Sequence, residues 1–313
     1  MAWQFLERGV EFLISSDGRP GSSRVAAGLV NPVTGKNFGT SWRIVDFLPE
    51  AVAFYQKIEA ALGVRFWHPL PVLRLARDAR EWRRIEARMT NPEAVPWIAG
   101  TVAAPDGWHA AVALRGGGRL DARTFLDASM RRFDASGIHQ DALIGFPGGD
   151  HTIFCEGAAG LMGGKLGPQR CAKGEILTIH APGWPQTHIK VGAGGWLVPI
   201  GDGQFKAGST YEWNTLDNQP TDAGRGRVEE IARTLGNDDA FTLIAHEAGV
   251  RPILRRSQPL MGRHPDGCWI FNGLGSKGSL YAPGCARRLA DACLDGTEIE
   301  ADLDFQAFLH GHT

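Results

Sequence analysis

A glycine-rich loop near the carboxyl end of the chain most constrains what it can fold into. Residues 273–278 place Gly273, Gly275 and Gly278 in the spacing G-x-G-x-x-G, after a strand-like run and before a helix-like segment. Such a loop holds a dinucleotide pyrophosphate when another strand follows and ends in an acidic residue about 20 residues later. Glu298 and Glu300 lie at that distance, but only 13 residues of the 313-residue chain remain after Glu300. A dinucleotide-binding domain cannot be completed there.

Three interpretations of this loop stay open on spacing alone. It could be a dinucleotide loop, as in an NAD-type dehydrogenase, although the remaining length argues against this. It could be a helix-entry turn whose glycines allow close packing. It could also contact a different part of a bound cofactor. The chain has 41 glycines, nearly twice the usual share of about 7%, and this excess favours sites where the backbone closely approaches a ligand such as a nucleotide.

Hydrophobic periodicity predicts an α/β protein. Helices are expected at 48–62, 78–89, 123–133, 222–235 and 282–294, and residues 1–9 read as the end of a helix that Gly9 terminates. Strands are expected at 10–14, 66–75, 110–113, 151–155 and 268–272, and residues 156–160 read as a small-residue turn. Residues 174–209 alternate strand-like runs with glycine and proline turns, which is typical of antiparallel sheet. The simplest architecture is an α/β nucleotide domain with an inserted antiparallel sheet domain.

Charge and cysteine content exclude several function classes. The formal net charge of −1 does not indicate a nucleic-acid partner. The arginines of the helix at 78–89 could bind phosphate or form a solvated face. Five cysteines without a CxxC pair indicate reduced thiols, and no metal motif is present. No signal peptide opens the chain and no 18-residue apolar run occurs, so we expect a cytoplasmic protein that does not span a membrane.

Six segments, in order along the chain, resemble the FAD-dependent D-amino-acid oxidase superfamily, which includes glycine and sarcosine oxidases. They cover nearly the whole chain, and the last resembles the oxidoreductase half of the bifunctional enzyme that makes 5-methylaminomethyl-2-thiouridine in tRNA. The segments are residues 22–32, 117–121, 153–159, 170–175, the pair 249–252 and 259–262, and residues 273–278 with Ala282 and Pro283.

The resemblance implies a Rossmann-like FAD-binding domain formed by residues 1–40, 105–165 and 250–313. Residues 41–104 and 166–249 would form a mixed, mainly antiparallel substrate domain. The implied activity is oxidation of an amine or amino-acid C–N bond by hydride transfer to the flavin, with imine hydrolysis and production of hydrogen peroxide. A small amine or amino acid would be the substrate, and tRNA remains open although the net charge does not indicate it. The oligomeric state cannot be read from the sequence.

The resemblance also assigns roles to particular residues. Arg251 would bind a substrate carboxylate, since a guanidinium matches a carboxylate by two parallel hydrogen bonds; the alternative is a structural arginine paired with an acidic residue such as Glu247. Lys277 would place positive charge near the flavin, or face solvent. Tyr211 and Trp213 would line the substrate pocket, or belong to the core. The residues expected to contact the cofactor are Ser23, Arg24, Gly28, Gly157, Gly275, Ser276, Gly278 and Ser279.

One departure from the family pattern concerns the amino end. The strand and glycine loop that the family places before its first helix would precede Met1, and the acidic residue expected after the second strand is replaced by Ser15 and Ser16, with Asp17 next. We expect Met1 to be an internal methionine of a longer reading frame, and a truncated protein with weakened cofactor binding is the alternative. A second function therefore stays open, that of a degenerate flavoprotein relative without FAD that acts as a binding or scaffold protein.

Overall fold

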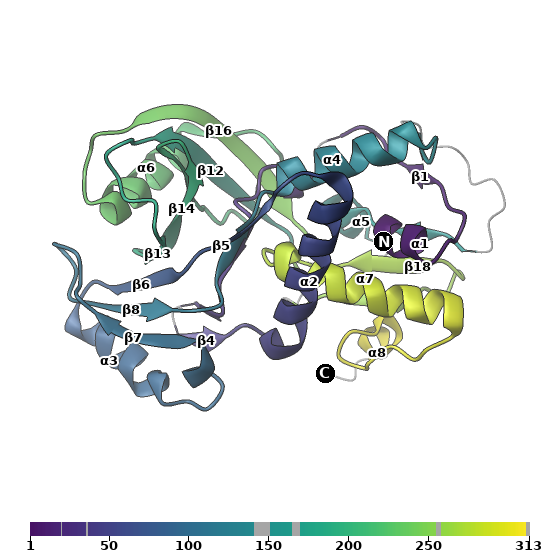
Figure 1. The fold of residues 1–313 in the computed structure, drawn as a ribbon, viewed down its shortest axis with the longest axis horizontal. Coiled ribbons are helices and arrows are strands. Elements are labelled where there is room, and N and C mark those ends of the chain that lie inside the picture. Colours follow the sequence, from purple (N-terminus) through teal and green to yellow (C-terminus); the bar gives the residue numbers. More distant parts are fainter. Residues whose placement is uncertain (20, 36, 141–150, 165–169, 255–257, 311–313) are drawn as a thin grey trace.

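The computed structural model describes residues 1–19, 21–35, 37–140, 151–164, 170–254 and 258–310. A large sheet forms one half of the molecule, and helices packed around smaller sheets form the other (Figure 1). The long helices α2 (Ile44–Leu62) and α7 (Gly278–Asp295) cross in the second half, close to the short amino-terminal helix α1 (Ala2–Glu7). This arrangement confirms the predicted α/β class with a mixed, mainly antiparallel sheet.

The large sheet has eight strands in the order β16-β12-β15-β14-β13-β6-β8-β7. Every neighbouring pair is antiparallel except β13 with β6. The strands are β16 (Thr242–Arg251), β12 (Ala172–His180), β15 (Gln204–Gly208), β14 (Gly195–Gly201), β13 (Ile189–Gly192), β6 (Val72–Ala76), β8 (Ala110–Leu114) and β7 (Ile98–Val102).

The two faces of this sheet carry different side chains because successive residues of a strand point to opposite faces. Leu177, Ala207 and Leu197 lie opposite one another on one face. That face is covered by helix α6 (Asp222–Gly236), and its leucines pack against Val228 and Ile231. The other face carries the row Ile176, Gly208 and Trp196. Helix α3 (Ala79–Met89) packs its buried Ile85 beside Val72 and Val112.

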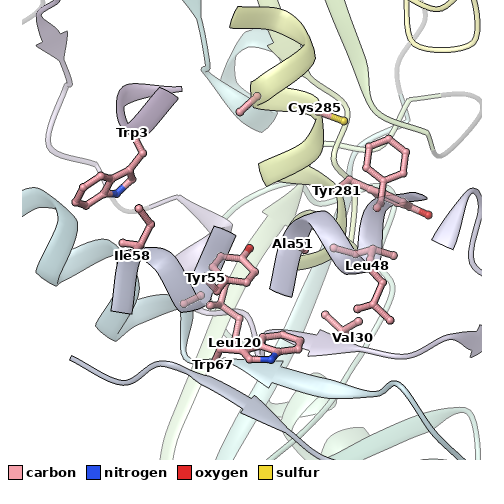
Figure 2. Packing of buried hydrophobic residues seen from close by; sticks show 14 of the residues in the cluster. Trp3, Val30, Leu48, Ala51, Tyr55, Ile58, Trp67, Leu120, Tyr281 and Cys285 are labelled. Carbon is pink, nitrogen blue, oxygen red and sulfur yellow. The ribbon is translucent and has the colours of Figure 1, made fainter. Parts of the chain in front are cut away.

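The helical half is built around an aromatic core. Tyr55 of α2 stacks on Trp67, and Tyr281 of α7 packs edge-on against Phe47. Figure 2 shows Tyr55 beside Trp67 and Tyr281 on the neighbouring helix. Trp3 of α1 packs against Phe133 of α4 (Ala122–Ala135). This core fixes α7, and therefore the glycine loop that precedes it.

Short strands complete the second half. Parallel pairs form between β1 (Ile14–Ser15) and β10 (His139–Gln140), and between β11 (Ile153–Phe154) and β18 (Trp269–Asn272). The latter also pairs with β17 (Leu260–Arg263). The other small sheets join β2 (Leu29–Val30), β9 (Gly118–Leu120) and β5 (Trp67–Pro69), and β3 (Val33–Thr34) with β4 (Gly39–Thr40). The remaining elements are η1 (Ser22–Arg24), η2 (Val95–Trp97), α5 (Gly157–Met162) and α8 (Phe305–Leu309).

Four predicted elements differ from the structure. The strand expected at 10–14 is reduced to β1, and the run at 66–75 divides into β5 and β6, which belong to different sheets. The small-residue turn at 156–160 lies mostly in helix α5, and α7 begins at Gly278 rather than near 282. The predicted division into two domains stays a prediction; α2, expected in the substrate part, shares its core with α7.

Candidate functional site

A cleft of about 2700 Å³ lies between the large sheet and the loops of the helical half. Its sheet side is the face that carries Ile176, Gly208 and Trp196, which we call the open face. Ordinary ligand pockets have volumes of roughly 300–1000 Å³, so this cleft has room for a ligand of nucleotide size together with a second molecule. The structure brings nearly all the predicted site residues to its wall. Those lining it are Arg251, Lys277, Ser23, Arg24, Gly28, Gly157, Gly275, Ser276, Gly278, Ser279 and Tyr211, whereas Trp213 lies outside the lining.

Arg251 lies at the end of the edge strand β16 and is held without a carboxylate. Its guanidinium donates to Ser209 Oγ at 2.8 Å and to the Thr210 carbonyl at 3.3 and 3.4 Å. Burial lowers the pKa of Arg251. The acidic partner considered from sequence, Glu247, instead accepts from Arg123 at 2.6 Å. Among the described residues no carboxylate forms an ion pair with Arg251, so its charge is available to a ligand in the cleft.

Gly174 is a residue that sequence reasoning placed in a motif but not in the site. It lies on β12, where a Cβ atom would come within 1.8 Å of Arg251 Nη2. The absence of a side chain here therefore makes the space that the guanidinium occupies. The signal could not be read from sequence, because it depends on the pairing of β12 with β16.

The rings of Tyr211 and Trp213 stack on each other at the surface, and neither residue belongs to the core. Tyr211 is 54% exposed and Trp213 40% exposed, and their rings stack at 6.0 Å between centroids. The Arg251 guanidinium lies 4.3 Å from the centre of the Tyr211 ring, and Arg170 lies 4.6 Å from that of Trp213. Both aromatic rings thus have a guanidinium against them, and Tyr211 contributes to holding Arg251.

Lys277 stands at the entrance of α7 and also lacks a carboxylate. Its Nζ donates to Thr34 Oγ1 at 3.2 Å and to Ser41 Oγ at 3.1 Å. Burial lowers the pKa of Lys277. Its amino group is thus turned toward β3 and the β4–α2 turn rather than toward solvent, and no ion pair involves it among the described residues.

The first turn of α7 has no side-chain cap and no acidic residue. The first N–H groups of a helix lack intrahelical partners, and those of Gly278 and Ser279 belong to residues that line the cleft. Gly275 has a φ of +57°, which favours glycine, and a Cβ there would make only ordinary van der Waals contacts, with Ile253 Cγ1 at 3.9 Å and the Gly273 carbonyl oxygen at 4.0 Å. The entrance of α7 therefore offers unpaired donors and a positive helix end to an anionic or carbonyl group.

Two further glycines expected to approach a cofactor, Gly28 and Gly157, differ in their surroundings. A Cβ on Gly28 would come within 1.8 Å of the Leu120 carbonyl oxygen, so contact with β9 already explains this glycine. Gly157 begins α5 with a φ of +54° and has open space around its Cβ position. Its carbonyl accepts from Asn272 Nδ2 at 3.0 Å, which joins α5 to the end of β18.

The loop carrying Ser23 and Arg24 is fixed by groups from the large sheet. Lys206 of β15, another residue missed from sequence, donates from Nζ to the Val25 carbonyl at 2.8 Å and to that of Ala26 at 3.3 Å. Burial lowers the pKa of Lys206. Arg24 itself forms an ion pair with Asp127 of α4. The strands that form the open face therefore also set the position of the loop across the cleft.

The described residues contain neither a candidate metal centre nor a membrane-spanning helix. Across the described ranges, no group of three or more histidine, cysteine, aspartate or glutamate side chains could hold a metal ion. None of the described helices is long and apolar enough to cross a membrane.

A large cleft lined by glycines, an uncapped helix entrance and two cations without a carboxylate partner among the described residues are typical of a protein that binds an anionic cofactor. Residues 1–292 match the family model described as DAO, FAD dependent oxidoreductase. The chain therefore belongs to the DAO family of FAD-dependent oxidoreductases, and FAD is its cofactor.

Relatives agree with this assignment. The chain is 30% identical over 150 residues to a glycine oxidase of Pseudomonas aeruginosa, a match that spans 46% of this chain and 41% of that protein. It is 27% identical over 147 residues to the tRNA 5-methylaminomethyl-2-thiouridine biosynthesis bifunctional protein MnmC of Burkholderia mallei, spanning 45% of this chain and 22% of that one.

Solved structures share the fold. Glycine oxidase from Geobacillus kaustophilus superposes with a TM-score of 0.81 at 19% identity, over 95% of this chain and 91% of that one. Iminodiacetate oxidase from Chelativorans sp. BNC1 gives a TM-score of 0.77 at 21% identity, over 96% and 93%.

The residues present fit FAD. The cleft is large enough for it, the uncapped entrance of α7 leaves backbone donors on the wall, and Gly157 leaves open space there. Lys277 adds a half-buried cation with no carboxylate among its described contacts.

Proposed function

We propose that this protein oxidises the C–N bond of an amine that carries a carboxylate, such as an amino acid or an N-alkyl glycine. Arg251 carries the proposal, because it combines partial burial, a fixed position on the cleft wall and the absence of a carboxylate partner among the described residues. A guanidinium is a strong and geometrically matched receptor for a carboxylate. The domain division predicted from sequence is retained as part of this proposal, with the open sheet face supplying the substrate side.

Because Arg251 is partly buried, it should discriminate between carboxylates and neutral groups as well as attract carboxylates. Removing a guanidinium from water costs free energy, and a bound carboxylate offsets that cost more fully than a neutral group does. Ser209, Thr210 and Tyr211 restrain the guanidinium before substrate arrives, so little side-chain entropy is lost on binding. An amine without a carboxylate leaves this charge uncompensated and should bind weakly.

When bound, FAD supplies a two-electron acceptor for a hydride from the carbon beside the substrate nitrogen, and its reoxidation by oxygen would give hydrogen peroxide. The substrate loses that hydride and the nitrogen proton to become an imine, which water hydrolyses to a carbonyl compound and an amine. Lys277 and the α7 entrance would stabilise negative charge at the cofactor. Trp213 would support the ring of Tyr211. The residues that would line the cofactor side of the cleft are Ser23, Arg24, Gly157, Gly275, Ser276, Gly278 and Ser279.

The test measures oxygen consumption by the FAD-loaded protein with sarcosine, glycine and iminodiacetate, and with the amide analogue of each. Turnover should require the carboxylate. Arg251→Lys should raise KM for the carboxylate substrates at least tenfold, because one ammonium cannot form two parallel hydrogen bonds. Arg115→Lys is the matched control, since exposed Arg115 donates to the Ile98 carbonyl far from Arg251 in the sheet. An unchanged KM in Arg251→Lys would contradict the assigned role.

A further inference from the structure

The cleft has a second cationic end that the proposed chemistry does not use. Arg74 of β6, Arg77 just before α3 and Arg84 of α3 line it there. On the open sheet face a row of paired residues leads from this end toward β16, the strand that carries Arg251. Arg74 pairs with Val191 of β13, Val191 with Trp196 of β14, Trp196 with Gly208 of β15, and Gly208 with Ile176 of β12. Five strand spacings separate β16 from β6, which corresponds to about 24 Å.

The carboxylates at this end are already engaged. Glu81 accepts from Arg74 Nη2 at 2.8 Å with one oxygen and from the Arg77 backbone N–H at 3.0 Å with the other. Asp78 caps α3 by accepting from the Glu81 N–H at 2.7 Å. Three guanidiniums therefore face two carboxylates, and those of Arg77 and Arg84 have no ion pair among the described residues.

The arginines on and beside α3 differ in their position relative to the cleft. Arg84, and Arg77 just before the helix, line the cleft, whereas Arg80, Arg83 and Arg88 lie outside its lining, and all five residues are exposed. Ile85 is buried against the sheet and fixes which side of α3 faces it. The second cationic end of the cleft therefore has two guanidiniums, those of Arg77 and Arg84, that form no ion pair among the described residues.

We propose that Arg77 and Arg84 form an anion-binding subsite that takes a phosphate or carboxylate group at the far end of an extended amine substrate. The inference rests on the proposed function and specifies its substrate class. A guanidinium fork matches both oxyanions. A free amino acid bound at Arg251 would leave most of the open sheet face unoccupied. A longer substrate, with its amine near Arg251 and an anionic group at its far end, would extend along the row from Trp196 to Arg74.

Direct binding is tested first, on the FAD-loaded protein at low ionic strength. Pyrophosphate is the phosphate probe and succinate the carboxylate probe, each titrated by calorimetry. The double variant Arg77→Ala with Arg84→Ala is compared with Arg80→Ala with Arg83→Ala, which removes the same charge from two arginines of α3 that lie outside the cleft lining. We expect the Kd of at least one probe to rise tenfold in the first variant and to stay unchanged in the second. Equal Kd values in the two variants would overturn the subsite.

Substrate use is tested second. N-alkyl glycines with linkers of increasing length would end in a carboxylate, a phosphate or a neutral amide. We expect an anionic end to lower KM at least tenfold relative to the amide once the linker is long enough, and the advantage to vanish only in the Arg77 and Arg84 variant. An equal KM for anionic and neutral ends at every length would overturn the substrate class. If the wild type oxidises none of them, the proposed function fails, and the calorimetric comparison still decides whether the subsite exists.

Discussion

The two faces of the eight-stranded sheet use the same strands for opposite purposes. On the face under α6, Leu177, Leu197 and Phe205 are almost completely buried and form a continuous apolar core. On the other face Gly174, Gly208 and Gly249 interrupt the side-chain layer and leave room for Arg251, Trp196 and the loop at 22–26. Because successive residues of a strand point to opposite faces, one face of the sheet serves stability and the other serves binding. Neighbouring residues in β12 should therefore respond differently to substitution.

Among the substitutions on the open face, we expect Gly174→Ala to have the largest effect on activity. A Cβ atom would occupy the position of the Arg251 guanidinium, so the arginine must leave its place. We expect kcat/KM for a carboxylate substrate to fall about 100-fold, or ~2.7 kcal/mol, with the protein still folded by circular dichroism. A variant that keeps wild-type kcat/KM would show that the guanidinium position is not needed.

Leu177→Ala, three residues further along the same strand, tests the opposite face. Removing a fully buried leucine should lower the free energy of unfolding by about 2–5 kcal/mol in urea denaturation. KM should stay unchanged for the molecules that remain folded, because Leu177 does not line the cleft. A large KM change with intact stability would remove the distinction between the faces.

Lys206→Met tests whether the open face positions the loop at residues 22–26, which is predicted to contact the cofactor. The variant loses the donations to the Val25 and Ala26 carbonyls, so we expect the Kd for FAD to rise about tenfold, or ~1.4 kcal/mol, measured by flavin fluorescence. Lys206→Arg, which can still donate to carbonyls, should restore much of the affinity. Equal FAD affinity in all three proteins would show that this contact does not position the loop.

Lys277 tests the helical side of the cleft through pH. Burial lowers its pKa in the folded protein below the ordinary 10.5, so between those two values the unfolded chain binds more protons and folding becomes more favourable as pH rises. For the FAD-free protein, the free energy of unfolding of the wild type relative to Lys277→Met should therefore increase across this window and level off above pH 10.5. A difference that stays flat with pH would place Lys277 in contact with water.

The smallest expected effect is that of Trp213→Ala. Trp213 supports Tyr211 from outside the cleft, and an exposed aromatic contact contributes about 0.5–1 kcal/mol. We expect KM to rise two- to fivefold. A change as large as that of Gly174→Ala would instead place Trp213 in direct contact with substrate.

Much of the fold follows from local patterns in the sequence. Amphipathic spacing predicts α3, α4 and α6, and Gly63 marks the end of α2. Strand-like runs between glycine and proline turns predict β12 to β15. The helix α5 was missed because residues 157–160 are only glycine and alanine, which leave no hydrophobic periodicity. The predicted cofactor contacts near both glycine-containing loops remain predictions, although all of them line the cleft: Ser23, Arg24, Gly275, Ser276, Gly278 and Ser279.

The parts of the site that could not be predicted depend on pairing between distant segments. Gly174 matters because β12 lies beside β16, and Lys206 because β15 reaches the loop after η1. Likewise only their place in the cleft lining distinguishes Arg77 and Arg84 from the other exposed arginines on and beside α3. Single-chain periodicity carries none of this information, since it reports which face of an element is buried and not what lies opposite.

The central claim is that this FAD-dependent oxidoreductase recognises its amine substrate through the carboxylate bound by Arg251. Anaerobic mixing of the FAD-loaded protein with an N-alkyl glycine, followed by flavin absorbance near 450 nm, tests it most directly. We predict rapid bleaching with the carboxylate substrate, at least tenfold weaker half-saturation in Arg251→Lys, and little bleaching with the matched amide. Equal bleaching by amide and carboxylate, at the same half-saturation in wild type and variant, would contradict the account.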